Sequence, residues 1–326
     1  MLRSMYSGIS GMKANQTKLD VIANNIANVG TTSFKASKVN FSDTLYQTSN
    51  SATAPTDSIG GTNAKSIGLG AKVASINKLM TKGNLLTTGR SLDVSIDGDG
   101  YFIAAKGKTT GSIAVDSSSN GITGSTDIDQ QVYTRDGNLT LDENGNLLTS
   151  NGYRVMGYWT SSSAVTRDTN GNAVVASRVD PDSTFTYDTA LRPLVIPDKV
   201  NGKAVESFDI GSNGVVTAVT SEGRSVLGQI AMASFKNPEG LKDLGGNFEQ
   251  ESGNSGAAMI STSASTTTNS NSGAFGAISQ GYLEASNVDL TEQFTDMISA
   301  TRAFQASSKM ISNGDEILQT ITGLIR

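Results

Sequence analysis

The chain has 326 residues, of which 25 are Lys or Arg and 30 are Asp or Glu, so its net charge is −5. Only 37% of the residues are hydrophobic and 6% are aromatic, which predicts two or three modest, elongated β-rich domains rather than one thick body. An acidic chain without a basic stripe lacks the electrostatic signature of a nucleic-acid-binding protein.

Cysteine and histidine are both absent from the sequence. Disulfides, thiol nucleophiles, thiolate zinc sites and haem attachment are therefore excluded, as are the commonest general base and the commonest metal ligand. We expect no enzymatic activity, no metal and no cofactor. Catalysis by carboxylates or lysine is the alternative that this composition leaves open.

The sequence contains no run of eighteen apolar residues, so we expect no membrane-spanning helix and no membrane insertion. Near the N-terminus, Gly8, Ser10, Gly11, Lys13 and Asn15 interrupt the apolar residues. A cleaved signal peptide of the usual kind is therefore not predicted, and export would need another route.

Apolar residues at heptad spacing predict a helix from Leu2 to about Asn28, with Gly30 as the C′ glycine that ends it. Gln16 and Ala23 continue the stripe at the intervening positions. The apolar members of this predicted stripe are Leu2, Met5, Ile9, Met12, Leu19 and Ile26.

A second helix is predicted at the C-terminal end, where Asp289 is a candidate N-cap with Glu292 three residues later. Thr301, Ser308 and Asp315 interrupt its stripe. The apolar members of this stripe are Leu290, Phe294, Met297, Phe304, Ile311 and Leu318.

The two predicted helices are suited to pair with each other. Residues 1–35 carry a net charge of +3 and residues 282–326 a net charge of −3, although such attraction is weak and screened by salt. Gly8 and Gly11 each cost a helix about 1 kcal/mol relative to Ala. We expect helices that are largely unfolded in a monomer and that order on assembly; a pair that closes an ordinary domain is the alternative.

The middle of the chain has the pattern of short antiparallel strands with frequent turns. Residues 92–96 alternate, two Asp-Gly pairs follow at 97–100, and residues 132–141 read as strand, Asp-Gly turn, strand. Asn144-Gly145 and Asn151-Gly152 are further turn signals. We expect a sandwich or barrel-like domain, with polar loops at 107–124 and 253–272 and a linker within 48–70.

Several motifs, in the same order along the chain, resemble those of the rod–hook axial family of the bacterial flagellum. They are residues 21–28 and 31–35, with Ser33 where family members usually have Gly, then 92–93, 97–102, 133–138, 194–197, 235–241, 281–290 and 302–306. The individual motif residues are Asn24, Asn25, Asn28, Phe34, Lys35, Asn287, Asp289 and Arg302.

Pattern and resemblance together predict an α+β fold, in which long terminal helices pair as a coiled-coil core domain beside a mainly antiparallel central β-domain. The expected core domain comprises residues 1–35 and 282–326, followed by an extended linker at 36–75. The expected β-rich domain comprises residues 76–157 and 191–281. A short insertion at 158–190 stands where larger hook proteins carry an outer domain, which we expect to be missing.

The resemblance implies a structural subunit that leaves the cell through the flagellar type III export apparatus and polymerises into a tube. Residues 1–8 look most like the start of hook subunits, so we expect a place in the flexible extracellular hook. The implied partners are further copies of the chain, the hook cap protein, the distal rod protein and the hook–filament junction protein. A distal rod subunit is the alternative, and a secreted β-rich binding module is a weaker one.

Three motifs of other protein classes are incomplete. A P-loop at Gly107-Lys108-Thr109 would need Gly at position 102, which is Phe102. Calcium loops starting at Asp142 or Asp168 lack the glycine at their sixth position. A nucleophile elbow at residues 253–256 has no histidine anywhere in the chain to activate its serine.

Overall fold

The computed structural model of the chain describes residues 2–57, 60–116, 118–160, 165–167, 173–181, 186–263 and 272–324. By their internal contacts the residues fall into two compact units. Unit 1 comprises residues 1–30, 35–79 and 287–326, and unit 2 comprises residues 31–34 and 80–286. The chain therefore passes between the units four times, at 30/31, 34/35, 79/80 and 286/287.

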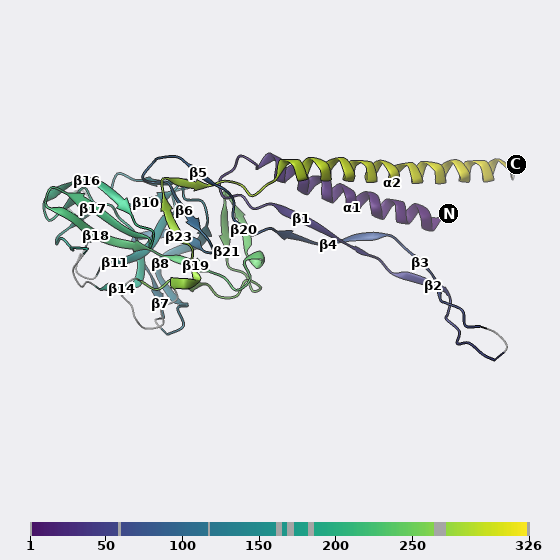
Figure 1. Cartoon of the computed structure of the whole chain (residues 1–326), viewed down its shortest axis with the longest axis horizontal. Coiled ribbons are helices and arrows are strands. Elements are labelled where there is room, and N and C mark those ends of the chain that lie inside the picture. The colour runs from purple at the N-terminus through teal and green to yellow at the C-terminus, as the bar shows by residue number, and fades with distance from the viewer. Residues whose placement is uncertain are drawn as a thin grey trace. The chain divides into compact units, whose positions relative to one another are not determined.

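Unit 1 contains the two long helices, α1 (Leu2–Ala27) and α2 (Leu290–Leu324), which pack side by side (Figure 1). Asp289 caps α2, because its Oδ1 accepts hydrogen bonds from the backbone N–H groups of Thr291 (2.8 Å) and Glu292 (3.3 Å). At the end of α1 the Nδ2 of Asn28 donates to the backbone oxygen of Asn24 at 2.9 Å. Gly30 does not have the positive φ expected of a C′ glycine.

The segment between the helix α1 and unit 2 consists of paired strands. β1 (Ser37–Asp43) pairs antiparallel with β4 (Ala71–Lys78), and β2 (Tyr46–Asn50) pairs antiparallel with β3 (Lys65–Gly68). The segment predicted as a linker, residues 36–75, thus lies inside unit 1 and largely forms ladders. The domain boundaries given above stay a prediction.

Unit 2 is built on one large sheet of mainly antiparallel strands, so the predicted α+β fold class is confirmed. Its strands occur in the order β12-β13-β15-β16-β17-β18-β11-β14-β7-β8-β21-β20, and β9, β10, β19 and β22 pair at its sides. Within the described residues, β13 with β15 is the parallel pair. β23 pairs with β6, and β24 with β5, outside this sheet. The bounds are β5 (Leu85–Thr87), β6 (Val94–Asp97), β7 (Tyr101–Val115), β8 (Ile122–Thr134), β9 (Leu139–Leu141), β10 (Leu147–Thr149), β11 (Arg154–Thr160), β12 (Val165–Arg167), β13 (Ala173–Val175), β14 (Tyr187–Pro193), β15 (Lys199–Val200), β16 (Lys203–Ile210), β17 (Val215–Thr220), β18 (Gly223–Ile230), β19 (Met232–Ser234), β20 (Lys242–Gly245), β21 (Phe248–Gln250), β22 (Met259–Ile260), β23 (Ala277–Gln280) and β24 (Tyr282–Glu284), with short 3₁₀ turns at Pro238–Gly240 and Ser272–Ala274.

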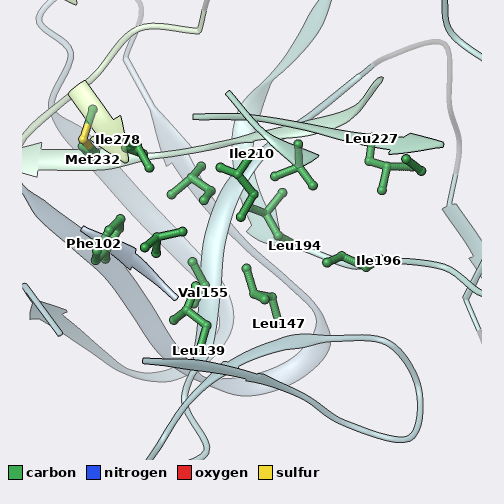
Figure 2. Close-up of a cluster of buried hydrophobic side chains, with 14 of the residues drawn as sticks. Phe102, Leu139, Leu147, Val155, Leu194, Ile196, Ile210, Leu227, Met232 and Ile278 are labelled. Atoms are coloured by element: carbon green, nitrogen blue, oxygen red, sulfur yellow. The ribbon is translucent and has the colours of Figure 1, made fainter. Parts of the chain in front are cut away.

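Strand β7 carries the core of unit 2 because both of its faces are covered. Side chains alternate between the faces of a strand, and Phe102 packs into one cluster while Tyr101 and Ile103 pack into another. Figure 2 shows Phe102 beside Val155 and Leu139 in the first cluster. Burial on two sides explains why residues 101–105 read as an unbroken apolar run rather than an alternating one.

Two local predictions in unit 2 were wrong. The polar stretch 107–124, expected as a loop, extends β7 and β8 into a long hairpin. Within it Ile113 is fully buried and pairs with Leu191 of the neighbouring strand β14. The expected hairpin over residues 132–141 does not form, since β8 pairs with β7 and β21 whereas β9 pairs with β10. Cross-strand burial outweighed composition in the first case and the Asp-Gly turn signal in the second.

Gly137 has a packing role instead of a turn role. Its carbonyl accepts a hydrogen bond from the N–H of Val94 at 3.0 Å, and a Cβ at this position would lie 1.6 Å from the carbonyl oxygen of Val94. By contrast, the turns at Gly145 and Gly152 have φ values of +75° and +81° and connect β9 to β10 and β10 to β11, as the sequence predicts.

We predict that Gly137→Ala destabilises unit 2 by about 3 kcal/mol, because backbone that cannot yield must move to admit the methyl group. Thermal unfolding followed by circular dichroism in the β-sheet region measures this. Gly124→Ala is the matched control, since nothing lies within 4 Å of its Cβ position and its φ is not positive. Equal melting temperatures for the two variants would contradict the packing role.

Candidate assembly interface

The helices α1 and α2 run antiparallel, and their contact is made by small residues. A Cβ on Gly8 would lie 3.4 Å from Cγ1 of Ile311, and a Cβ on Gly11 would lie 3.3 Å from Oγ of Ser307. A Cβ on Gly314 would lie 3.1 Å from Cγ of Met5. Each glycine therefore allows the two helices to approach more closely than a larger side chain would permit.

The contact face of α2 alternates large and small residues. These residues follow one another along the helix at steps of four and three. Each is at least partly buried, and Ala300 and Gly314 are buried. The residues are Gln293, Met297, Ala300, Phe304, Ser307, Ile311, Gly314 and Leu318. This is a heptad pattern of two interleaved series, one bulky and one small.

Four members of the predicted α2 stripe lie on this contact face, namely Met297, Phe304, Ile311 and Leu318. Leu290 and Phe294 do not, since their side chains are exposed, Phe294 at 49%. The intervening seam positions are also one residue earlier than expected, at 300, 307 and 314 instead of 301, 308 and 315. The small residues spaced by seven were the available signal, and they are easily missed beside larger apolar neighbours.

Most of the predicted α1 stripe is at least partly buried, with one exception. Met5 lies against Gly314, and Met12, Leu19 and Ile26 are partly buried, whereas Ile9 is exposed. The side chain of Leu2 lies outside the described residues. Gly8 and Gly11, read from the sequence as weak points of the helix, are the positions that face α2. The assembly role of the twelve stripe residues stays a prediction.

Asn25 joins three segments of unit 1. Its side chain is 1% exposed, and its Nδ2 donates to the backbone oxygen of Ser37 (2.8 Å) and to Oε1 of Gln293 (3.0 Å). Its Oδ1 accepts from the backbone N–H of Ser37 at 3.0 Å. A buried amide with its donors and its acceptor engaged fixes α1 against both β1 and α2.

Asn287 plays a similar part immediately before α2. Its Oδ1 accepts from the backbone N–H of Ala36 at 2.7 Å, and its Nδ2 donates to the backbone oxygen of Leu79 at 2.7 Å. Lys18 and Asp296 add an ion pair of 3.1 Å between the helices, partly exposed and therefore weak.

The remaining motif residues are spread over both units. Lys35 is buried, Phe34 is half-buried, and Asn24 is exposed and hydrogen-bonded to Asn28. Arg302 lies on the exposed side of α2, where its Nη1 donates to Oε1 of Gln305 at 3.2 Å. The motif residues are thus structural supports and surface groups, not one assembled site.

The outer surface of α2 carries large apolar side chains that unit 1 leaves uncovered. Ile298 is 63% exposed, Ile317 50% and Leu324 81%. Leu290, Phe294 and Ile298 follow one another at steps of four, as do Ile317 and Ile321, and Met310 is exposed as well. Exposed apolar residues in such number on one helix are typical of an interaction surface.

Neither α1 nor α2, over the stretches described, has a segment apolar enough to span a bilayer. Within the described ranges, acidic side chains do not gather in the threes that a metal site needs.

Three family models match the chain. They are described as "Flagella basal body rod protein" over residues 5–35, "Flagellar hook protein FlgE/F/G D1 domain" over 123–218 and "Flagellar basal body rod FlgEFG protein C-terminal" over 279–324. The first and last of these cover most of α1 and α2.

Relatives match the chain over its full length. The flagellar basal-body rod protein FlgG of Bacillus subtilis (strain 168) is 40% identical over 333 residues, covering 100% of both chains. The flagellar hook protein FlgE of Treponema pallidum (strain Nichols) is 30% identical over 470 residues, covering 100% of both chains. The solved structure of the Helicobacter pylori flagellar hook protein FlgE2 matches 61% of this chain and 100% of its own at 10% identity, with a TM-score of 0.40.

Full-length identity of this extent, together with models at both ends and in the middle, establishes the kinship that the motifs suggested. The chain belongs to the flagellar rod/hook FlgE/F/G family and is a non-enzymatic axial subunit of the bacterial flagellum.

Proposed function

We propose that the chain is a subunit of the distal rod, the straight part of the flagellar axis that lies in the basal body. The observation that carries this proposal is the 40% identity with a FlgG rod protein over the whole of both chains. The sequence prediction of a hook subunit depended on residues 1–8, and we replace it with the alternative of a distal rod subunit.

The lengths of the alignments support the rod reading. Rod proteins FlgG from Bacillus subtilis and Agrobacterium fabrum align over 333 and 334 residues, close to the length of this chain. The hook proteins FlgE of Borreliella burgdorferi and Treponema pallidum need 448 and 470 residues to cover the same chain. Those hook proteins therefore contain long insertions that this chain lacks.

We propose that the insertion of the longer hook proteins falls between β11 and β14 of unit 2. β11 ends at Thr160 and β14 begins at Tyr187, and both are neighbours in the large sheet. Residues 161–186 between them are too few for a further β-domain. Absence of an outer domain fits a rod subunit better than the longer hook subunits.

Assembly is proposed to use the exposed face of α2. Copies related by a heterologous, open contact form a helical tube, and the uncovered apolar residues of α2 would be buried between copies. The partners proposed on this basis are further copies of the chain and neighbouring axial proteins. Export through the flagellar type III apparatus stays a prediction.

The shape of the polymer separates rod from hook. We predict that the purified chain, under polymerising conditions, forms straight tubes in electron micrographs, because a rod must transmit torque without bending. Curved tubes that change curvature with solvent conditions would support the hook reading instead.

Substitutions on two faces of α2 separate folding from assembly. Ile317→Asp places a charge on the exposed face and is predicted to abolish polymerisation, measured by sedimentation, without altering the monomer. Ala300→Asp places a charge at a position that is 2% exposed and is predicted to cost the helix pair about 3 kcal/mol, so the pair should not order even under polymerising conditions.

Ser312→Asp is the matched control, because Ser312 is exposed and polar; it should polymerise as the parent does. Normal polymers from Ile317→Asp would remove the assembly role of this face. In each variant the β-sheet signal of unit 2 should persist.

The helix pair is predicted to gain order on assembly. Circular dichroism of the monomer should show mostly strand, with helix appearing as polymers form, because small contact residues and helical glycines leave the isolated pair marginal. A monomer whose α1 and α2 amides already resist hydrogen exchange would contradict this.

A further inference from the structure

Four residues that follow α1 belong to unit 2 and form a strap (residues 31–34). The backbone N–H of Ser33 donates to the carbonyl of Glu284 at 2.8 Å, and its Oγ donates to the carbonyl of Arg135 at 2.8 Å. Thr32 donates through Oγ1 to Oδ1 of Asp136 at 3.0 Å, and Asn247 donates to the carbonyl of Thr32 at 3.0 Å. Ser33 is buried with φ of +57°, a left-handed conformation unusual for a residue other than glycine.

The two carbonyls that hold Ser33 belong to residues whose side chains form a buried ion pair. Nε of Arg135 lies 3.0 Å from Oε2 of Glu284, and the side chains are 8% and 0% exposed. The same guanidinium donates to the carbonyls of Gly100 (3.0 Å) and Gly98 (2.8 Å). The pair therefore fixes the positions of the two carbonyls that bind the strap.

Glu284 binds a third segment as well. Its Oε1 accepts a hydrogen bond from the backbone N–H of Gly83 at 3.0 Å. A Cβ on Gly83 would lie 1.9 Å from the carbonyl oxygen of Ala285, so the two segments run in close contact. The chain passes between unit 2 and unit 1 in three segments: the strap, the segment after Leu79, and the segment that ends at Ser286. Glu284 lies in the last of these and hydrogen-bonds to the other two.

In unit 1 the continuations of these segments are hydrogen-bonded through Asn287, which lies three residues after Glu284 in the chain. Asn287 binds the N–H of Ala36 and the carbonyl of Leu79, and the N–H of Leu79 donates to the carbonyl of Ala36 at 2.8 Å. Ala36 and Leu79 are the second and the last residue of the stretch 35–79 of unit 1, and Asn287 is the first residue of the stretch 287–326.

A buried ion pair is weak evidence for added stability, since desolvation offsets most of its attraction. Its better-attested role is to specify one arrangement among several. Here the arrangement is the meeting of three chain segments. Glu284 binds them in unit 2, and Asn287, three residues later, binds their continuations in unit 1.

We propose that Glu284, paired with Arg135, holds these three segments within unit 2, and that Asn287 holds their continuations within unit 1; the two together are called the clamp, and through it mechanical load is shared by four peptide connections. The load-sharing part rests on the proposed function as an axial subunit, whereas the clamp itself does not.

Hydrogen exchange of the full-length monomer, followed by mass spectrometry, tests the clamp. In the parent chain the amides of Ser33 and Gly83 should be protected. Glu284→Gln should raise the exchange rates of both by about 100-fold, because an unpaired guanidinium is left buried, while amides of β17 and β18 keep their protection. Asp188→Asn, which removes an ion pair of 3.1 Å with Arg192 at the surface, is the control and should change neither amide.

Two results would overturn the clamp. Unchanged exchange at Ser33 and Gly83 in Glu284→Gln would show that the ion pair does not hold the segments. Loss of protection throughout β17 and β18 would show that it supports the sheet instead.

The double variant Thr32→Val, Ser33→Ala keeps the test independent of the ion pair. It removes the two side-chain hydrogen bonds of the strap and should raise exchange at residues 31–34 by about tenfold, leaving Gly83 as in the parent. Protection that survives at residues 31–34 would argue against the strap.

Swimming in media of raised viscosity tests load sharing separately. Cells whose only copy carries Glu284→Gln should assemble polymers and swim normally in dilute medium, but lose motility at a lower viscosity than cells with the parent or Asp188→Asn. Equal motility at every viscosity would overturn load sharing, and polymers that never form from the parent chain would instead count against the axial function.

Discussion

The close approach of α1 and α2 is the contact on which the arrangement of unit 1 depends. It joins residues near opposite ends of a 326-residue chain, and it does so through Gly8, Gly11 and Gly314. Each glycine weakens its own helix by about 1 kcal/mol relative to Ala but lets the backbones meet. Each helix therefore depends for its stability on packing against the other rather than on its own sequence, as is expected of segments that become ordered only on assembly.

Unit 2 follows the opposite principle. Its strand β7 is covered on both faces, with Phe102 in one cluster and Ile103 in another, both without exposed surface. A sheet with two apolar layers can fold without neighbours, whereas the helix pair presents Ile298 and Ile317 to solvent. The chain thus combines one unit whose large apolar side chains are mostly enclosed with one that leaves several of them exposed, as is typical of an interaction surface.

The sequence predicted the elements better than their contacts. Heptad spacing located both helices, Asp289 marked the start of α2, and Gly145 and Gly152 marked real turns. The largest apolar residues did not reveal the phase of the helix contact, because Ile9, Leu290 and Phe294 are among them and are exposed. Gly137 illustrates the other limit: an Asp-Gly pair signals a turn, but the close carbonyl of Val94 belongs to a strand some forty positions earlier.

Whether the chain is a rod subunit or a hook subunit is likewise not decided by the elements that the sequence predicts. Residues 1–8 begin the helix α1, an element that rod and hook relatives share, so a likeness there says little about which of the two this chain is. The difference in length between the alignments, 333 residues with a rod protein and 470 with a hook protein, must be accommodated outside the shared helices. The proposed place is the interval between β11 and β14, two strands that are neighbours in the large sheet. On this proposal the feature that separates rod from hook is a domain that the chain lacks rather than a motif that it has.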